Sequence, residues 1–133
     1  MVIPNSSDLM HWEIGDHGFA MGLSPLVPET VGAALLPWLR DWLKEQAIDL
    51  EAVTSWAVHP GGPKILSTCA EVLSLDPGLL HESRGILQDH GNMSSATILF
   101  ILDRLRRRST TGPCLALAFG PGLSAEVALF DFQ

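Results

Sequence analysis

The sequence predicts an α/β fold in which helices pack on a mixed, mainly parallel sheet. Short apolar segments alternate along the chain with longer segments whose apolar residues recur at helical spacing, and this alternation is typical of layered α/β domains. Clusters of Gly and Pro separate the segments. The chain has 133 residues, and a domain near this length buries roughly two-thirds of its unfolded surface. Residues 1–133 are therefore predicted to form a single domain.

The first predicted elements are a strand and a helix. Residues 1–11 are expected to form an irregular lead-in, and the short apolar segment His17–Ser24 is expected to be a strand. The turn over residues 24–29 places Pro28 in the first turn of a helix, where proline is well tolerated. Apolar residues then recur at helical spacing from Val31 to about Gln46.

The middle of the chain is predicted to contain one buried strand followed by helices. The strand is Val53–Val58, and the breaker cluster His59–Pro63 ends it. The helical segments expected after it cover residues 65–73, 79–88 and 95–105.

Two strands are predicted at the end of the chain, Cys114–Phe119 and Glu126–Phe132, and they can pair as an antiparallel hairpin. The predicted order is therefore β-α-β-α-α-α-β-β. A sheet with so few strands leaves an edge and a face for something else to cover.

Composition and charge exclude several classes of function. Hydrophobic residues make up 47% of the chain and charged residues only 17%, against about a quarter charged in ordinary soluble domains, so part of the surface is expected to be covered by a partner. The net charge of -7 argues against nucleic-acid binding. The one basic run, Arg104 with Arg106–Arg108, is interpreted as the solvated end of a helix.

Membrane and secretory roles are not expected either. No apolar run reaches the roughly 18 residues that span a bilayer, and Met1–Asp8 lacks the features of a signal peptide. Two cysteines provide no disulfide framework, so a cytoplasmic location is expected. The five His show no zinc-ligand spacing, and no metal site is expected.

Two polar residues occupy positions where α/β domains often place functional groups. His59 follows a buried strand and precedes two glycines, which allow a ligand to approach the backbone closely. Asn92 precedes the start of a helix. On these features alone, His59 is equally well explained as a residue satisfied by neighbouring backbone. Asn92 is better explained as a turn residue that tolerates positive φ.

Three motifs, in order, resemble those of type III polyketide synthases, the chalcone and stilbene synthase-like group. Trp56–Leu66 resembles the segment around their catalytic His, and Gly91–Thr97 resembles their catalytic Asn segment. Phe119–Leu123 resembles most of their C-terminal G-F-G-P-G loop, although Ala118 replaces its first Gly. The resemblance extends from about Trp12 to Phe132. The sequences His-Pro-Gly-Gly-Pro at residues 59–63 and Asn-Met-Ser-Ser at residues 92–95 favour the type III polyketide synthases over the ketoacyl-ACP synthase III group.

The resemblance implies the C-terminal half of a thiolase-like fold, in which two similar α/β halves form one subunit. It assigns His59 and Asn92 to a Cys-His-Asn triad, and the N-terminal half that carries the Cys is expected to be absent from this chain. Neither Cys69, inside an amphipathic helix, nor Cys114, at the start of a strand, fits the pattern of the nucleophile. Both are interpreted as small buried hydrophobic residues.

The resemblance also implies a substrate site. The residues expected to line the acyl and cyclisation cavity are Met21, Ser94, Phe119, Gly120, Pro121 and Gly122. Met21 falls where plant members commonly place a gatekeeping Phe. The residues expected beside the pantetheine arm of CoA are Gly61, Gly62 and Lys64, although Lys64 is equally well explained as a solvated side chain.

The implied reaction is the decarboxylative condensation of an acyl-CoA with malonyl-CoA, with CoA thioesters as substrates and no cofactor. The implied partners are acyl-CoA, malonyl-CoA, an N-terminal half-domain and further copies of the chain in a homo-oligomer. The isolated chain is expected to be inactive. The alternative is a non-catalytic truncated module for self-association or partner binding, which the missing Cys and the apolar composition support. A weaker alternative is an independent acyl-CoA-binding or thioesterase-like activity that uses His59.

Overall fold

The computed structural model describes residues 1–133. Its strands and helices are β1 (Met10–Gly15), β2 (Gly18–Leu23), α1 (Val27–Glu45), β3 (Ser55–Val58), α2 (Pro63–Val72), α3 (His81–His90), α4 (Ala96–Arg107), β4 (Gly112–Gly120) and β5 (Ser124–Phe132). Short 3-10 helices precede β1, β3 and α3. None of the helices combines the length and apolar character needed to cross a membrane.

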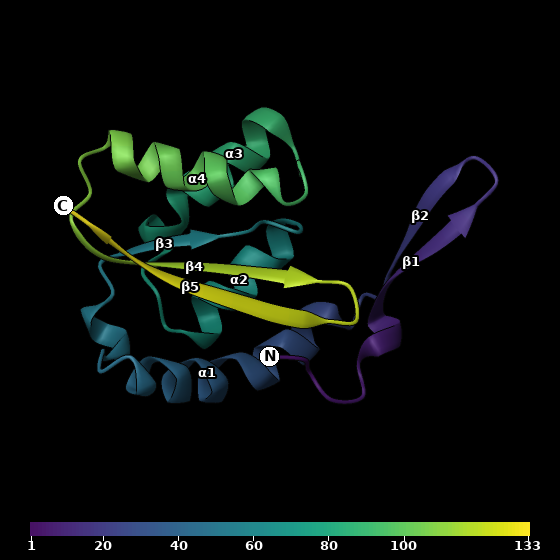
Figure 1. The fold of residues 1–133 in the computed structure, drawn as a ribbon, viewed down its shortest axis with the longest axis horizontal. Coiled ribbons are helices and arrows are strands. Elements are labelled where there is room, and N and C mark those ends of the chain that lie inside the picture. Colours follow the sequence, from purple (N-terminus) through teal and green to yellow (C-terminus); the bar gives the residue numbers. More distant parts are fainter.

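A mixed three-stranded sheet forms the middle layer, in the order β3-β4-β5. β3 runs parallel to β4, and β5 pairs with β4 as the predicted antiparallel hairpin. Helices α1 and α2 cover one face of the sheet, and α3 and α4 cover the other (Figure 1). The α/β class and the mixed sheet are therefore confirmed. The sheet is not mainly parallel as expected, because β3–β4 is its one parallel pair and the longer β4–β5 pair is antiparallel.

Alternation along the strands divides the core into two parts, because successive side chains of a strand point to opposite faces. Trp56 and Val58 of β3 belong to the larger cluster, together with the apolar stripe of α1 and residues of α2. Ala57 faces the other way and joins a smaller cluster with Ile86 of α3 and Ile101 of α4. The four residues of β3 are all buried, so the strand that precedes His59 is fixed from both sides.

The hairpin formed by β1 and β2 is a separate two-stranded sheet that projects from the body of the molecule (Figure 1). β2 confirms the strand predicted at His17–Ser24. The prediction that residues 1–11 are irregular is wrong at its end, because β1 begins at Met10 and pairs along its whole length with β2. Met10, Trp12 and Ile14 alternate with polar residues, which is the pattern of a strand with one apolar face.

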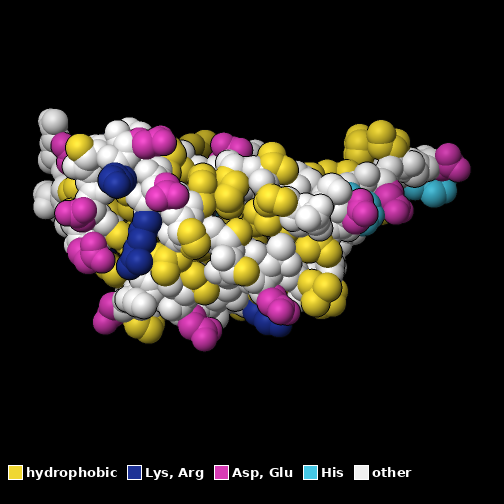
Figure 2. Space-filling model, turned by 90° about the horizontal axis from the view of Figure 1, so that it is seen from below, with side chains coloured by type: hydrophobic (Ala, Val, Ile, Leu, Met, Phe, Trp, Pro, Cys, Tyr) yellow, Lys and Arg dark blue, Asp and Glu magenta, His cyan; other side chains and the backbone are white.

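The apolar face of this hairpin is exposed over much of its length. Trp12 lies opposite Met21, and Ile14 lies opposite Phe19; the exposed fractions of Ile14 and Phe19 are 83% and 71%. Figure 2 shows apolar side chains gathered on one side of the projecting arm, with His and acidic side chains on the other. This arm adds to the uncovered apolar surface that the composition predicts.

The basic run at the end of α4 only partly matches its interpretation as a solvated helix end. The side chains of Arg106 and Arg107 are largely exposed and pair with Asp103 of their own helix. Arg104 is only 31% exposed and binds Asp89 of α3. Arg108 binds the buried Glu82. The interpretation is therefore wrong for Arg104, which joins α4 to α3. It holds for Arg108, whose side chain is 61% exposed although it also pairs with α3.

Candidate active site

A cavity of about 600 Å³ lies where the hairpin, the start of α1, the end of β3, the α3–α4 loop and the β4–β5 turn meet. The predicted site residues that line it are Met21, His59, Gly61, Gly62, Lys64, Asn92, Ser94, Phe119 and Pro121. Gly120 and Gly122 belong to the same β4–β5 turn but are not among the lining residues. Residues far apart in sequence are thus brought to one cavity, while their roles stay predictions.

The parallel pairing of β3 with β4 positions His59. Its backbone N–H donates to the carbonyl oxygen of Leu117 at 2.8 Å, which continues the ladder one residue past the end of β3, and its own carbonyl accepts from the Gly61 N–H at 3.1 Å. The ring makes no hydrogen bond within the chain, and burial lowers its pKa below the ordinary value of 6.5 because desolvation penalises the cation. Near neutral pH the imidazole is therefore neutral and able to accept a proton.

A tight turn between α3 and α4 positions Asn92. Its side-chain Oδ1 accepts the Ser94 N–H at 2.8 Å, so the Nδ2 amide is the group left to donate into the cavity. The next residue, Met93, donates its N–H to the Thr97 hydroxyl at 2.9 Å. Asn92 is a turn residue, as expected, but the positive φ angles belong to Gly91 and Ser94. Asn92 can therefore stabilise the turn through Oδ1 and also donate a hydrogen bond from Nδ2.

The cavity wall includes residues that sequence reasoning missed. Met10 and Trp12 of β1 line the cavity, as does the segment Leu23–Pro25. The alternation of apolar and polar residues before Gly15 is the signal that would have placed Trp12 opposite Met21. Lys64 is the only Lys or Arg in the lining, and no Asp or Glu contributes to it. The wall is therefore mainly apolar, with a single permanent positive charge.

Neither cysteine can serve as the nucleophile of this cavity. Both are fully buried elsewhere and do not line it. Burial raises the pKa of Cys69 to about 12. Burial also raises the pKa of Cys114, although the nearby Ser55 side chain and Ala57 backbone oppose the rise. A thiol acts as a nucleophile only when it is ionised, so both residues fit the interpretation as small buried hydrophobic residues.

We expect iodoacetamide to leave both cysteines of the native chain unmodified near pH 7. With its pKa at about 12, Cys69 carries about 10³-fold less thiolate than an ordinary exposed thiol at this pH. Mass spectrometry of the intact chain should show no adduct under conditions that fully alkylate a small thiol, and two adducts after unfolding in guanidinium. Fast single alkylation of the folded chain would instead reveal a reactive cysteine.

Comparison with known proteins agrees with this arrangement. Residues 1–131 match the family model described as "Chalcone and stilbene synthases, C-terminal domain". The 1,3,6,8-tetrahydroxynaphthalene synthase of Streptomyces peucetius subsp. caesius is 34% identical over 129 residues, which is 95% of this chain and 34% of that protein.

Two solved structures superpose on the whole chain. PKS-I from the brown algae Ectocarpus siliculosus matches with a TM-score of 0.94 and 25% identity, and the match covers 38% of that protein. The 1,3,6,8-tetrahydroxynaphthalene synthase of Streptomyces coelicolor A3(2), described as a bacterial type III polyketide synthase, matches with a TM-score of 0.92 and 32% identity over 39% of its chain. The present chain thus spans little more than a third of the length of these relatives.

The fold is that of the C-terminal half of a thiolase-like condensing enzyme. The chain belongs to the family of chalcone and stilbene synthase C-terminal domains, within the type III polyketide synthases. The resemblance seen in the three sequence motifs is therefore confirmed.

Proposed function

We propose that this chain supplies the His and Asn of a type III polyketide synthase active site, which joins an acyl-CoA to malonyl-CoA with loss of carbon dioxide. The observation that carries the proposal is the convergence of His59 and Asn92 on one mainly apolar cavity. The nucleophilic Cys would come from an N-terminal half, either earlier in the same polypeptide or on a separate chain. The isolated chain would then be catalytically incomplete.

The proposed reaction has two stages. A thiolate of the N-terminal half attacks the carbonyl carbon of acyl-CoA, forms an acyl-cysteine thioester and releases the CoA thiolate. Malonyl-CoA then loses carbon dioxide, and the electron pair of the broken C–C bond generates the enolate of acetyl-CoA. The enolate carbon attacks the acyl-cysteine, a new C–C bond forms and the cysteine thiolate leaves, giving a β-ketoacyl-CoA.

His59 and Asn92 have distinct proposed roles in these steps. His59, neutral because its pKa is lowered, accepts the thiol proton and then stabilises the thiolate as its ion-pair partner. Asn92 donates from Nδ2 to the thioester oxygen of malonyl-CoA, which carries the negative charge of the enolate, and a His N–H donates to the same oxygen. Asn92 is exposed in this chain, so the proposed roles need the N-terminal half to cover the cavity and exclude water, which strengthens both interactions.

The wall of the cavity supports CoA thioesters as substrates. It contains no carboxylate that would repel an anionic thioester, and Lys64 at the start of α2 provides a positive charge for a CoA phosphate. Gly61 and Gly62 line the approach to His59. These features support a pantetheine arm that reaches His59 past Lys64.

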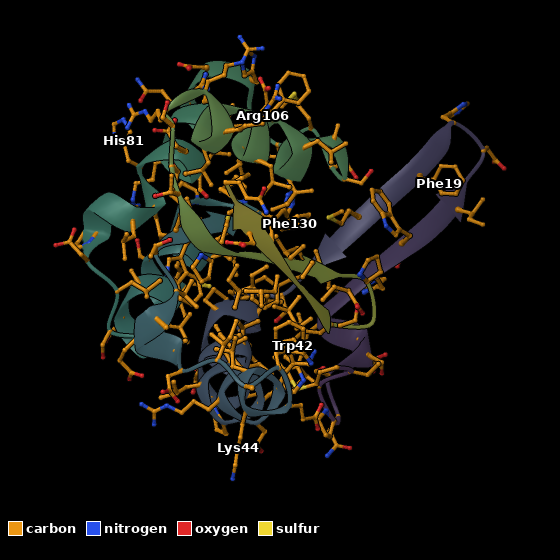
Figure 3. All side chains as sticks on the ribbon, turned by 60° about the vertical axis from the view of Figure 1, so that its left-hand side comes forward. Phe19, Trp42, Lys44, His81, Arg106 and Phe130 are labelled. Carbon is orange, nitrogen blue, oxygen red and sulfur yellow. The ribbon has the colours of Figure 1, made fainter.

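The alternative proposal is a non-catalytic module that associates with itself or with another protein. The observation in its favour is the amount of exposed apolar surface away from the cavity, which includes Ile14, Phe19, Leu99 and Phe130. Figure 3 shows Phe19 on the hairpin and Phe130 on β5, two separate parts of that surface. Such surfaces usually mark an interface, and both proposals require one.

Reassembly distinguishes the two proposals. The chain is co-expressed with the Cys-bearing N-terminal half of the Streptomyces coelicolor relative, and carbon dioxide release from malonyl-CoA is measured together with sedimentation. We expect a complex of the two halves that turns over, while the chain alone associates with itself and does not. Self-association that persists unchanged with the added half, without turnover, would favour the non-catalytic module.

In the reassembled enzyme, His59→Ala should lower turnover about 10²–10⁴-fold, the usual range for loss of a proton-transfer group. The matched control is His81→Ala. His81 lies exposed at the start of α3, on the far side from the hairpin (Figure 3), and its loss should leave turnover unchanged. Full activity of His59→Ala would overturn the role given to His59.

A further inference from the structure

The helices on either side of the Asn92 turn are joined by a short ion pair. Arg104 Nη2 of α4 lies 2.6 Å from Asp89 Oδ2 of α3, and the contact is also a hydrogen bond. Asp89 is three residues before Asn92, in the last turn of α3. A second pair, Arg108 with the buried Glu82 at 2.8 Å, joins the other ends of the same helices. Of the two pairs, Asp89–Arg104 is the one nearer the Asn92 turn, since Asp89 is in the last turn of α3, although Arg104 itself is in the C-terminal half of α4.

Asp89 is poorly placed for the stability of α3 itself. The C-terminal end of a helix carries partial negative charge, so a carboxylate in the last turn is unfavourable. Arg104 offsets this charge and holds the pKa of the Asp89 carboxyl below its usual value, through their hydrogen bond and through charge attraction. The residue type at position 89 is thus explained by its partner on α4 and not by helix formation.

Gly85 gives Arg104 the space it needs. It lies inside α3, where glycine destabilises a helix relative to alanine. A Cβ added to Gly85 would lie 2.8 Å from Arg104 Nη1, so the guanidinium lies over the glycine. A larger residue there would require the flexible end of the Arg104 side chain to shift.

The position of α3 relative to α4 determines where Asn92 lies. On one side, the Gly91 N–H closes the last turn of α3 by donating to Leu87 at 3.0 Å. On the other side, the Met93 N–H donates to Thr97, which is fully buried in α4. Only Asn92 separates these two attachments. A shift of one helix against the other is therefore transmitted directly to Asn92.

We infer that Arg104, placed over Gly85 and bonded to Asp89, is a positioning residue that holds Asn92 at the cavity. This inference rests on the proposed function for the role of Asn92 in catalysis, whereas the placement of the turn can be tested without it. Since the pair is partly exposed, its contribution to overall stability is small. Its effect is expected in the geometry of the turn.

The structural test uses the chain alone and does not require catalysis. Hydrogen exchange at the Met93 amide, followed by NMR, should become about threefold faster in Arg104→Met and less so in Gly85→Ala, because the turn loses one attachment of the strength of a partly exposed ion pair. The internal reference is the Val58 amide, which donates to Ser83 Oγ at the other side of α3. The matched control is Arg107→Met, which removes an arginine that pairs only within α4. Unchanged Met93 exchange in both test variants would overturn the inference.

The catalytic test uses the reassembled enzyme. Arg104→Met should lower kcat about tenfold with KM for malonyl-CoA nearly unchanged, since misplacing a group by a fraction of an ångström lowers catalysis by such factors. Gly85→Ala should lower kcat in the same direction but by less, because the Arg104 side chain can shift. Arg104→Lys should recover part of the loss by restoring the positive charge. Arg104→Met is the sharper variant, because it removes the guanidinium itself, whereas in Gly85→Ala the flexible side chain of Arg104 can shift.

The two tests separate this inference from the proposed function. Faster Met93 exchange together with a reassembled complex that never turns over would support the positioning of Asn92 and contradict the proposed catalysis. Unchanged kcat in Gly85→Ala and Arg104→Met, in an active complex, would overturn the positioning role while leaving the proposed function intact.

Discussion

Replacing Asn92 with alanine is expected to lower kcat of the reassembled enzyme about 10²–10³-fold, measured as carbon dioxide release from malonyl-CoA. Loss of one oxyanion-hole donor in a preorganised site has an effect of about 3–4 kcal/mol on the barrier. The Oδ1 of Asn92 is already bonded to Ser94, so the Nδ2 amide is the donor that alanine removes. Because the bond to the enolate oxygen strengthens as charge develops, kcat should fall more than KM rises.

Alanine also removes the Ser94 hydrogen bond, so a second variant is needed to separate the turn from the donor. Asn92→Asp keeps an oxygen that can accept from the Ser94 N–H but replaces the Nδ2 donor with a carboxylate oxygen. It should therefore keep the thermal stability of the parent chain and still lose turnover. Wild-type turnover in Asn92→Asp would show that Asn92 serves the turn alone and would remove the oxyanion-hole role.

The main layers of the fold follow from signals that are local in the sequence. Helix α1 is predicted because its buried residues recur at helical spacing, and β3 because an apolar run ends at the Gly and Pro cluster after His59. Strand β1 is not among the elements that the sequence predicts. Its alternating residues gain little burial from the body of the molecule, and its identity depends on pairing with β2, which is a contact between segments.

In the candidate site, too, some features follow from local sequence and others depend on contacts between distant segments. The positions of His59 and Asn92 in the sequence place them at a strand end and before a helix, but their convergence on one cavity depends on the β3–β4 pairing and on the packing of α3 against α4. Gly85 and Arg104 carry no local signal of a joint role. From the sequence alone, a glycine inside a helix is expected to destabilise it, and an arginine near a helix end is expected to be solvated. The structure instead places the Arg104 guanidinium over Gly85.

The largest expected effect on stability belongs to Trp56. This residue is 1% exposed and packs in the larger core cluster between the sheet and helices α1 and α2. Trp56→Ala should lower the free energy of unfolding by about 3–5 kcal/mol, because it removes buried apolar surface and leaves a cavity. Urea denaturation should show a lower midpoint with a similar slope.

Trp12 offers a matched control, because the same substitution there removes a tryptophan that is 47% exposed on the hairpin. Trp12→Ala should change the free energy of unfolding by less than about 1 kcal/mol. Equal losses in the two variants would contradict the assignment of Trp56 to the core. Trp56 also lies three residues before His59 on a four-residue strand, so the void left by alanine opens directly beneath the strand that presents the imidazole. Trp56→Phe, which fills most of that space, should retain more of both the stability and the turnover of the reassembled enzyme, and this joint recovery would connect the packing of β3 to the placement of His59.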